Sequence, residues 1–155
     1  MNIFNFDNSY SKLPDKFYAR LAPVAVSKPD MVVFNHALAH QLGLNTGHTT
    51  EQQLAAVFSG NSLPEGAESL AMAYAGHQFG SFVPQLGDGR ALVLGEILSP
   101  EQRRYDIALK GSGITPFSRS GDGRAPLAAV IKEYICSEAM AALGVPTTRS
   151  LAAVS

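Results

Sequence analysis

The sequence has no tryptophan, a single cysteine and few charged residues, which make up 16% of its 155 positions. One cysteine cannot form a disulfide within the chain, and such scarcity is typical of proteins in a reducing compartment. The 12 basic and 13 acidic residues nearly cancel, so the chain lacks the basic surface that nucleic-acid binding needs. We therefore expect no nucleic-acid partner.

Long hydrophobic runs and a secretory leader are also missing. No apolar run approaches the ~20 residues of a membrane-spanning helix. The first residues, MNIFNFD, do not place a basic region before an apolar core. These absences predict a cytoplasmic protein with no membrane partner. Hydrophobic residues make up 46% of the chain, which is enough to bury the core of one domain.

The segment 86–91, with the sequence LGDGRA, combines two glycines with an arginine between predicted strands at about 82–86 and 91–98. Glycine has no Cβ, so its backbone can approach a bound group and point N–H groups at it. The guanidinium of arginine suits bidentate binding of phosphate. Taken alone, a two-glycine turn is more often a plain hairpin.

A third predicted strand, at 105–110, ends at Lys110 and is followed by a glycine-rich loop over 111–125. Strand alternation places Ala108 and Lys110 on one face. Protein kinases have the same arrangement in their Val-Ala-Ile-Lys strand, whose lysine holds nucleotide phosphates and pairs with a helix glutamate. A long loop in a compact domain is usually functional. Together these features predict a nucleotide-binding lobe.

The strongest predicted helix, at 125–143, offers two possible carboxylate partners for that lysine, Glu133 and Glu138. A lysine charge removed from water needs such a partner. On a helical wheel Glu138 falls within the main apolar stripe, and Glu133 lies about a quarter-turn or more away. Periodicity therefore mildly favours Glu138 as the buried carboxylate and leaves the pairing open.

The rest of the chain is predicted from turn and cap signals. Three prolines make residues 1–30 an extended arm with short ordered pieces, whose apolar side chains pack on the main body. Helices are expected at 35–42 and, after a Thr-Glu-Gln-Gln capping box, at 50–60. One or two helical turns are expected at 69–74, and a last strand at 147–154.

Five motifs together resemble the selenoprotein O family. They are QLGDGRA at 85–91, LKGSGITPFSR at 109–119, GDGRA at 121–125, IKEYICSEAM at 131–140 and GVPTTR at 144–149. Members of that family have a protein-kinase-like fold and transfer AMP from ATP to hydroxyl groups of proteins. They are much longer than this chain, which resembles only their N-terminal part.

The resemblance implies an α+β fold: a protein-kinase-like small lobe of antiparallel strands and one long helix, with an N-terminal helical and extended extension. The lobe would span residues 73–155 and be truncated at its C-terminus, and the extension would span 1–72. ATP would be the cofactor, together with Mg²⁺ or Mn²⁺, whose ligands are expected beyond Ser155. The other partners would be proteins with serine, threonine or tyrosine hydroxyls.

The resemblance also implies roles for individual residues, and it chooses Glu133 over Glu138 as the partner of Lys110. Lys110 and Glu133 would serve catalysis, while the family's catalytic aspartate and metal ligands lie further along. The residues expected to contact the nucleotide are Gly87, Gly89, Arg90, Lys110, Asp122 and Gly123.

Three other interpretations are weighed against this one. The lobe could be a regulatory pseudokinase module that binds a nucleotide without catalysis. Cys136 could be a nucleophile, although a small core residue on an apolar helix is the simpler interpretation. His36 and His40 have the spacing of some zinc ligands, but no third ligand is evident, so we expect two surface histidines and no metal site.

Overall fold

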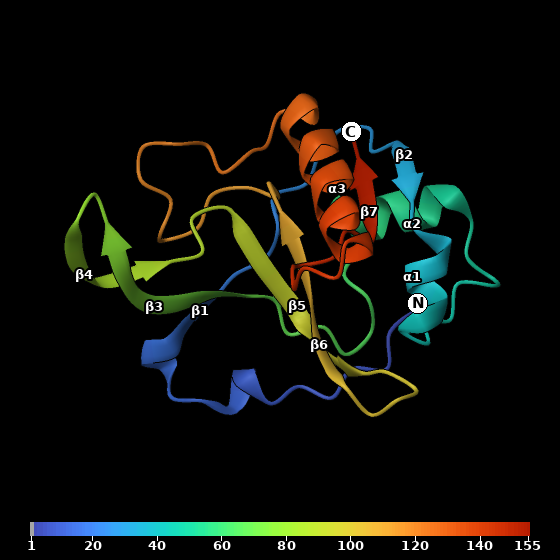
Figure 1. The fold of residues 1–155 in the computed structure, drawn as a ribbon, viewed down its shortest axis with the longest axis horizontal. Coiled ribbons are helices and arrows are strands. Elements are labelled where there is room, and N and C mark those ends of the chain that lie inside the picture. Colours follow the sequence, from blue (N-terminus) through green and yellow to red (C-terminus); the bar gives the residue numbers. More distant parts are fainter. Residues whose placement is uncertain (1) are drawn as a thin grey trace.

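The computed structural model describes residues 2–155 as an α+β fold with antiparallel sheets and one long helix (Figure 1). One sheet has five strands: β1 (Tyr18–Arg20), β3 (Leu70–Gln78), β4 (Ser81–Gly87), β5 (Ala91–Leu98) and β6 (Arg104–Lys110). A two-stranded sheet joins β2 (Met31–Phe34) to β7 (Ala152–Val154). The helices are α1 (His36–Gln41), α2 (Glu51–Phe58) and α3 (Leu127–Ala142), with short 3-10 turns at Tyr10–Lys12 and Asp15–Phe17.

The glycine segment 88–90 is not the tip of a hairpin. Both β4 and β5 pair with β3, through Ala73 opposite Gly87 and Leu70 opposite Val93. The segment therefore joins two strands that pair with successive parts of β3, and residues 88–90 themselves belong to neither strand. This arrangement excludes the plain-hairpin interpretation of the two glycines.

The three helices occur where the cap signals place them. The side chain of Asn35 accepts a hydrogen bond from the N–H of Leu38 at the start of α1. Thr50 and Gln53 form a reciprocal capping box at the start of α2, as the sequence predicts. Pro126 directly precedes α3, where its missing N–H costs nothing.

The helical turns predicted at 69–74 are wrong, because this segment belongs to strand β3. Leucine, alanine and methionine favour a helix locally. The segment instead pairs with β1 through Leu70–Met72, with β5 at Leu70 and with β4 from Ala73 onward. These pairings bury Leu70 and Ala71 almost completely, and that tertiary burial overrides the local preference.

The N-terminal arm is built into the main core, as its apolar residues predict. Phe4 is 1% exposed and packs in one cluster with Val57, Leu94 and Ile97. The carboxylate of Glu96, itself buried, accepts bonds from the backbone N–H groups of Ser9 and Tyr10, at 2.5 and 2.6 Å, and from the Ser9 hydroxyl at 2.7 Å. A buried charge of this kind needs several donors, and here the arm supplies them.

The last strand, β7, is shorter than predicted, since only 152–154 pair with β2. Before it, Arg149 and Ser150 direct their polar groups to Glu138 on α3 and leave the strand geometry.

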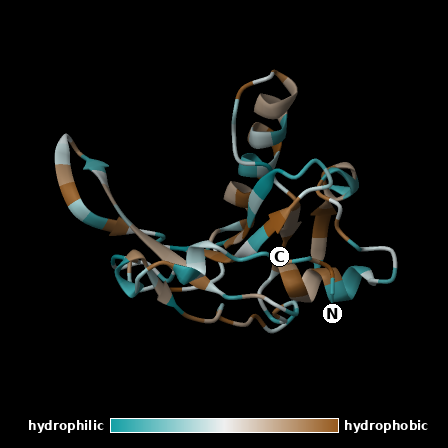
Figure 2. Ribbon diagram, turned by 90° about the horizontal axis from the view of Figure 1, so that it is seen from below, coloured by the Kyte–Doolittle hydropathy of each residue, from teal (hydrophilic) through white to brown (hydrophobic). Residues whose placement is uncertain are grey.

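At the opposite side of the molecule the β3–β4 hairpin extends well away from the other strands (Figures 1 and 2). Its tip exposes Phe79 and Phe82, with Phe79 95% exposed. No helix among residues 2–155 is long and apolar enough to cross a membrane.

Candidate functional site

Three charged side chains from three elements meet at the end of β6. The ammonium of Lys110 donates to a carboxylate oxygen of Glu133 on α3 at 2.7 Å. The guanidinium of Arg90 lies 3.8 Å from the other oxygen of the same carboxylate. The pairing that periodicity left open is therefore with Glu133. All three side chains are about half exposed, so the ion pairs add little to folding stability. Two cations and one anion leave the cluster with a net positive charge.

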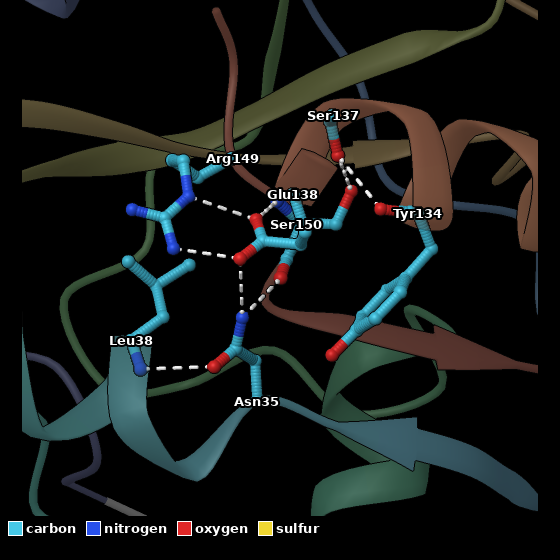
Figure 3. A network of polar contacts seen from close by, with 7 residues as sticks. All are labelled: Asn35, Leu38, Tyr134, Ser137, Glu138, Arg149 and Ser150. Atoms are coloured by element: carbon cyan, nitrogen blue, oxygen red, sulfur yellow. Dashed lines mark hydrogen bonds and ion pairs between the residues drawn. The ribbon is translucent and has the colours of Figure 1, made fainter. Parts of the chain in front are cut away.

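Glu138, the rival carboxylate, has a different set of partners, drawn in Figure 3. Its oxygens accept hydrogen bonds from the guanidinium of Arg149 at 2.6 and 2.8 Å, the amide of Asn35 at 2.9 Å and the N–H of Ser150 at 3.0 Å. These bonds, those of Arg149 first, lower its pKa from 4.5 to about 2. Its side chain is 22% exposed against 49% for Glu133. The helical wheel thus ranked the burial of the two carboxylates correctly.

The loop 115–118, which follows β6, is hydrogen-bonded to the glycine segment 88–90. The hydroxyl of Thr115 donates to the carbonyl of Asp88 at 2.5 Å, and the hydroxyl of Ser118 donates to the carbonyl of Gly89. The ring of Phe117 fills the space over Gly87, where an added Cβ would lie 2.4 Å from Cγ of the ring. Position 87 therefore needs glycine for close packing.

Asp88 is hydrogen-bonded to strand β3, and its carboxylate is therefore not free to interact with the charged cluster. Its carboxylate accepts from the N–H of Met72 at 3.0 Å and from the hydroxyl of Tyr74 at 3.3 Å. The N–H of Asp88 donates to the Met72 carbonyl at 2.9 Å. Burial and the nearby Asp88 charge raise the pKa of Tyr74. Asp88 thus fixes one end of the glycine segment to the sheet.

The second glycine loop, 121–124, is anchored to other backbone segments. The carboxylate of Asp122 accepts from the N–H of Arg124 at 2.9 Å. Gly123 has a φ of +71°, and an added Cβ would lie 1.9 Å from the carbonyl oxygen of Gly113. The guanidinium of Arg124 donates to the carbonyls of Val24 and Ala25 in the N-terminal arm. The guanidinium of Arg124 therefore holds the second glycine loop to the N-terminal arm.

The other candidates of the sequence stand apart from this cluster. Cys136 is exposed, so the expectation of a core cysteine is wrong. The ring of His36 packs edge-on against Phe34 at 4.9 Å between centroids. Within residues 2–155 no group of three histidine, cysteine or acidic residues is placed to hold a metal ion. Two cavities, of about 330 and 250 Å³, lie beside β2 and α2 and are not lined by the charged cluster.

Sequence reasoning missed the residues that support the cluster. Thr115, Phe117 and Ser118 stand in a motif of the family resemblance, but no local signal connects them to a turn some 27 residues earlier. Asn35 was read only as the start of a helix, and its amide also binds Glu138. Such long-range contacts have no periodic signature in one sequence.

Comparison with known proteins identifies the same family as the sequence motifs. All of residues 1–155 match the family described as protein adenylyltransferase SelO. Relatives named protein nucleotidyltransferase YdiU are 60% identical over 99% of the chain in Alkalilimnicola ehrlichii and 61% identical over 100% of it in Rhizobium meliloti. Another, from Rhodopseudomonas palustris strain BisB5, is 62% identical over 97%. The chain spans 31% of the length of each of these relatives. It belongs to the SelO family of protein adenylyltransferases.

Proposed function

We propose that this chain is the nucleotide-holding part of an enzyme that transfers AMP from ATP to hydroxyl groups of proteins. In this proposal residues 73–155 form a protein-kinase-like small lobe, and residues 1–72 form an extension that packs on it. The observation that carries the proposal is the contact of Lys110 with Glu133 at 2.7 Å, beside Arg90. An exposed cationic cluster next to a glycine segment is the arrangement that nucleotide phosphates require.

The residues fit ATP in charge and in backbone shape. Lys110 and Arg90 provide two cations, and Glu133 holds both in place. Gly87, Gly89 and Gly123 allow these two loops to pack closely on the rest of the chain: an added Cβ would lie 2.4 Å from the Phe117 ring, 3.1 Å from the Phe117 carbonyl oxygen and 1.9 Å from the Gly113 carbonyl oxygen, respectively. We propose these glycines and the two cations as nucleotide contacts, because glycine N–H groups, ammonium groups and guanidinium groups all bind phosphate oxygens. Asp122 is proposed as a further contact from the family resemblance alone.

When bound, ATP supplies an activated α-phosphorus. The acceptor hydroxyl would lose its proton to the catalytic aspartate expected in the part of the family's length that this chain does not span. Its oxygen would bond to the α-phosphorus as the bond to the β-phosphate oxygen breaks and pyrophosphate leaves. Lys110 and Arg90 would neutralise the phosphate charge and fix the chain of phosphates relative to the acceptor. Positioning and charge stabilisation of this kind account for most catalysis in phosphoryl transfer. The metal ligands, for Mg²⁺ or Mn²⁺, are proposed to lie in the part of the family's length that this chain does not span.

Replacement of Lys110 by alanine or methionine in the full-length protein tests the proposal. We expect AMP transfer to be abolished while the melting temperature stays within a few degrees, since a half-exposed ion pair contributes little to stability. The measurement is incorporation of labelled AMP into a protein substrate. Lys28→Met is a matched control, because Lys28 forms a solvent-exposed ion pair with Asp30. Unchanged incorporation in Lys110→Met would overturn the proposal, whereas ATP binding without any transfer by the wild type would favour the regulatory module.

A further inference from the structure

The glycine segment is held by two hydroxyl groups that its own strand does not provide. Thr115 donates to the carbonyl of Asp88, and Ser118 donates to the carbonyl of Gly89. Thr115 is only 5% exposed. Its N–H donates to the Ser118 hydroxyl at 2.8 Å, and its hydroxyl accepts from the N–H of Phe117 at 3.1 Å. Both hydroxyls are therefore fully engaged and fixed in direction.

Holding these two carbonyls also fixes two N–H groups. In a planar trans peptide the C=O and the following N–H point in opposite directions. The Asp88 carbonyl shares its peptide with the N–H of Gly89, and the Gly89 carbonyl shares its peptide with the N–H of Arg90. Because both carbonyls point to the 115–118 loop, both N–H groups point away from it. Among residues 2–155 no acceptor is found for either N–H.

We propose that Thr115 and Ser118 are positioning residues for the nucleotide, whose hydroxyls aim the N–H groups of Gly89 and Arg90 at its phosphates. The inference rests on the proposed function, since it assigns a ligand to the glycine segment. The chain leaves these two donors unsatisfied beside Arg90, whose guanidinium is 3.8 Å from Glu133. Two adjacent N–H groups that both point away from the 115–118 loop, next to a cation, can bind an anion. Without the hydroxyls, the peptide planes could rotate and the donors would lose their common direction.

The test uses the full-length protein with Thr115→Val, Ser118→Ala and the conservative Thr115→Ser. Each of the first two removes one hydrogen bond to the glycine segment and one bond within the 115–118 loop. For the loss of the bond to the glycine segment we expect the KM and Kd for ATP to rise about fivefold, corresponding to ~1 kcal/mol. Thr115→Ser keeps the hydroxyl and should restore the wild-type values within about twofold. Two independent variants keep the test valid if Thr115→Val does not fold.

The matched control is Ser59→Ala, which also removes a buried hydroxyl that donates to a backbone carbonyl, that of Ala56 at 3.1 Å. It should lower the melting temperature about as much as Ser118→Ala and leave the KM for ATP unchanged. Equal KM values in Ser118→Ala, Thr115→Val and wild type, with Lys110→Met inactive, would overturn this inference alone. Full activity of Lys110→Met would overturn the proposed function and this inference with it.

Discussion

Glu133 and Glu138 lie on the same helix, five positions apart, and their partners separate their roles. Glu133 is half exposed and contacts Lys110 and Arg90. Glu138 accepts four hydrogen bonds from Asn35, Arg149 and Ser150 and thereby ties α3 to α1 and to the segment before β7. The first arrangement provides charge at a surface, and the second provides attachment between elements.

Separate exchange of the two carboxylates should therefore give opposite results. We expect Glu133→Gln to reduce AMP transfer strongly and to change the melting temperature little, because its ion pairs are solvent-exposed. Glu138→Gln should mainly lower the melting temperature, because the Arg149 guanidinium loses its carboxylate partner. Both substitutions are made in the full-length protein, and both variants are measured for labelled AMP incorporation and thermal unfolding. The reverse pattern would show that the buried carboxylate is the one the reaction needs.

The stabilising effect of Glu138 should depend on pH. Its pKa is about 2 in the folded chain against an ordinary 4.5, so the ionised form favours folding. This contribution is fully present above pH ~4.5 and is lost as the pH falls toward 2, reaching at most about 3 kcal/mol. The difference in unfolding free energy between wild type and Glu138→Gln should shrink between pH 5 and pH 3 in urea titrations. A difference that stays constant over this range would contradict the assignment.

At the scale of elements, sequence signals located every helix but not every strand. Side-chain caps decide where α1 and α2 begin, and Pro126 marks the start of α3; both are local signals that one sequence displays. Strand β3 was missed, because its leucine, alanine and methionine residues are helix formers and only its pairing partners make it a strand.

The candidate site divides in the same way. The residue types of the cluster, and the strand that ends at Lys110, could be read from the sequence. The choice of Glu133 as the partner of Lys110 could not be derived from periodicity, since it depends on where the fold places α3 relative to the end of β6. The support from Thr115 and Ser118 depends on a contact between two loops and was equally out of reach.

The N-terminal arm offers a prediction at the scale of elements. Its attachment depends on Glu96, whose pKa is lowered because hydrogen bonds from Tyr10 and Ser9 outweigh the effect of burial. Glu96→Gln removes the charge that these donors share, and we expect a loss of about 2 kcal/mol in unfolding free energy. The exposed arm residues Lys12 and Lys16 should then be cut by trypsin faster than in the wild type.

The control for the arm is Glu101→Gln. Glu101 forms an ion pair with Arg103 at 3.7 Å, and both side chains are more than 70% exposed. An exposed pair of this kind should change stability by less than about 0.5 kcal/mol and leave the rate of trypsin cleavage as it is. Equal cleavage rates in Glu96→Gln and wild type would show that the arm is held by its apolar residues alone.

At the scale of the whole molecule, the candidate site lies on an open surface. Lys110 and Glu133 are 55% and 49% exposed, and none of the residues of α3 is fully buried. Apolar side chains on α3 are exposed too, among them Ile131, Ile135 and Met140, and so is Leu143 directly after the helix. Exposed apolar side chains that gather on one face of a helix often contact another protein surface. In the proposed function, residues 1–155 by themselves would therefore hold the nucleotide from one side only.

Residues 1–155 alone should bind ATP weakly and transfer no AMP. Phosphate contacts to half-exposed cations are weakened by water and by salt, so we expect a Kd for ATP and Mg²⁺ above about 1 mM. Calorimetric titration of the chain, beside its Lys110→Ala variant, measures this binding, and labelled AMP with a generic protein measures transfer. Micromolar binding that Lys110→Ala abolishes, or any transfer by the chain alone, would mean that these residues enclose a complete site, contrary to the open geometry around Lys110.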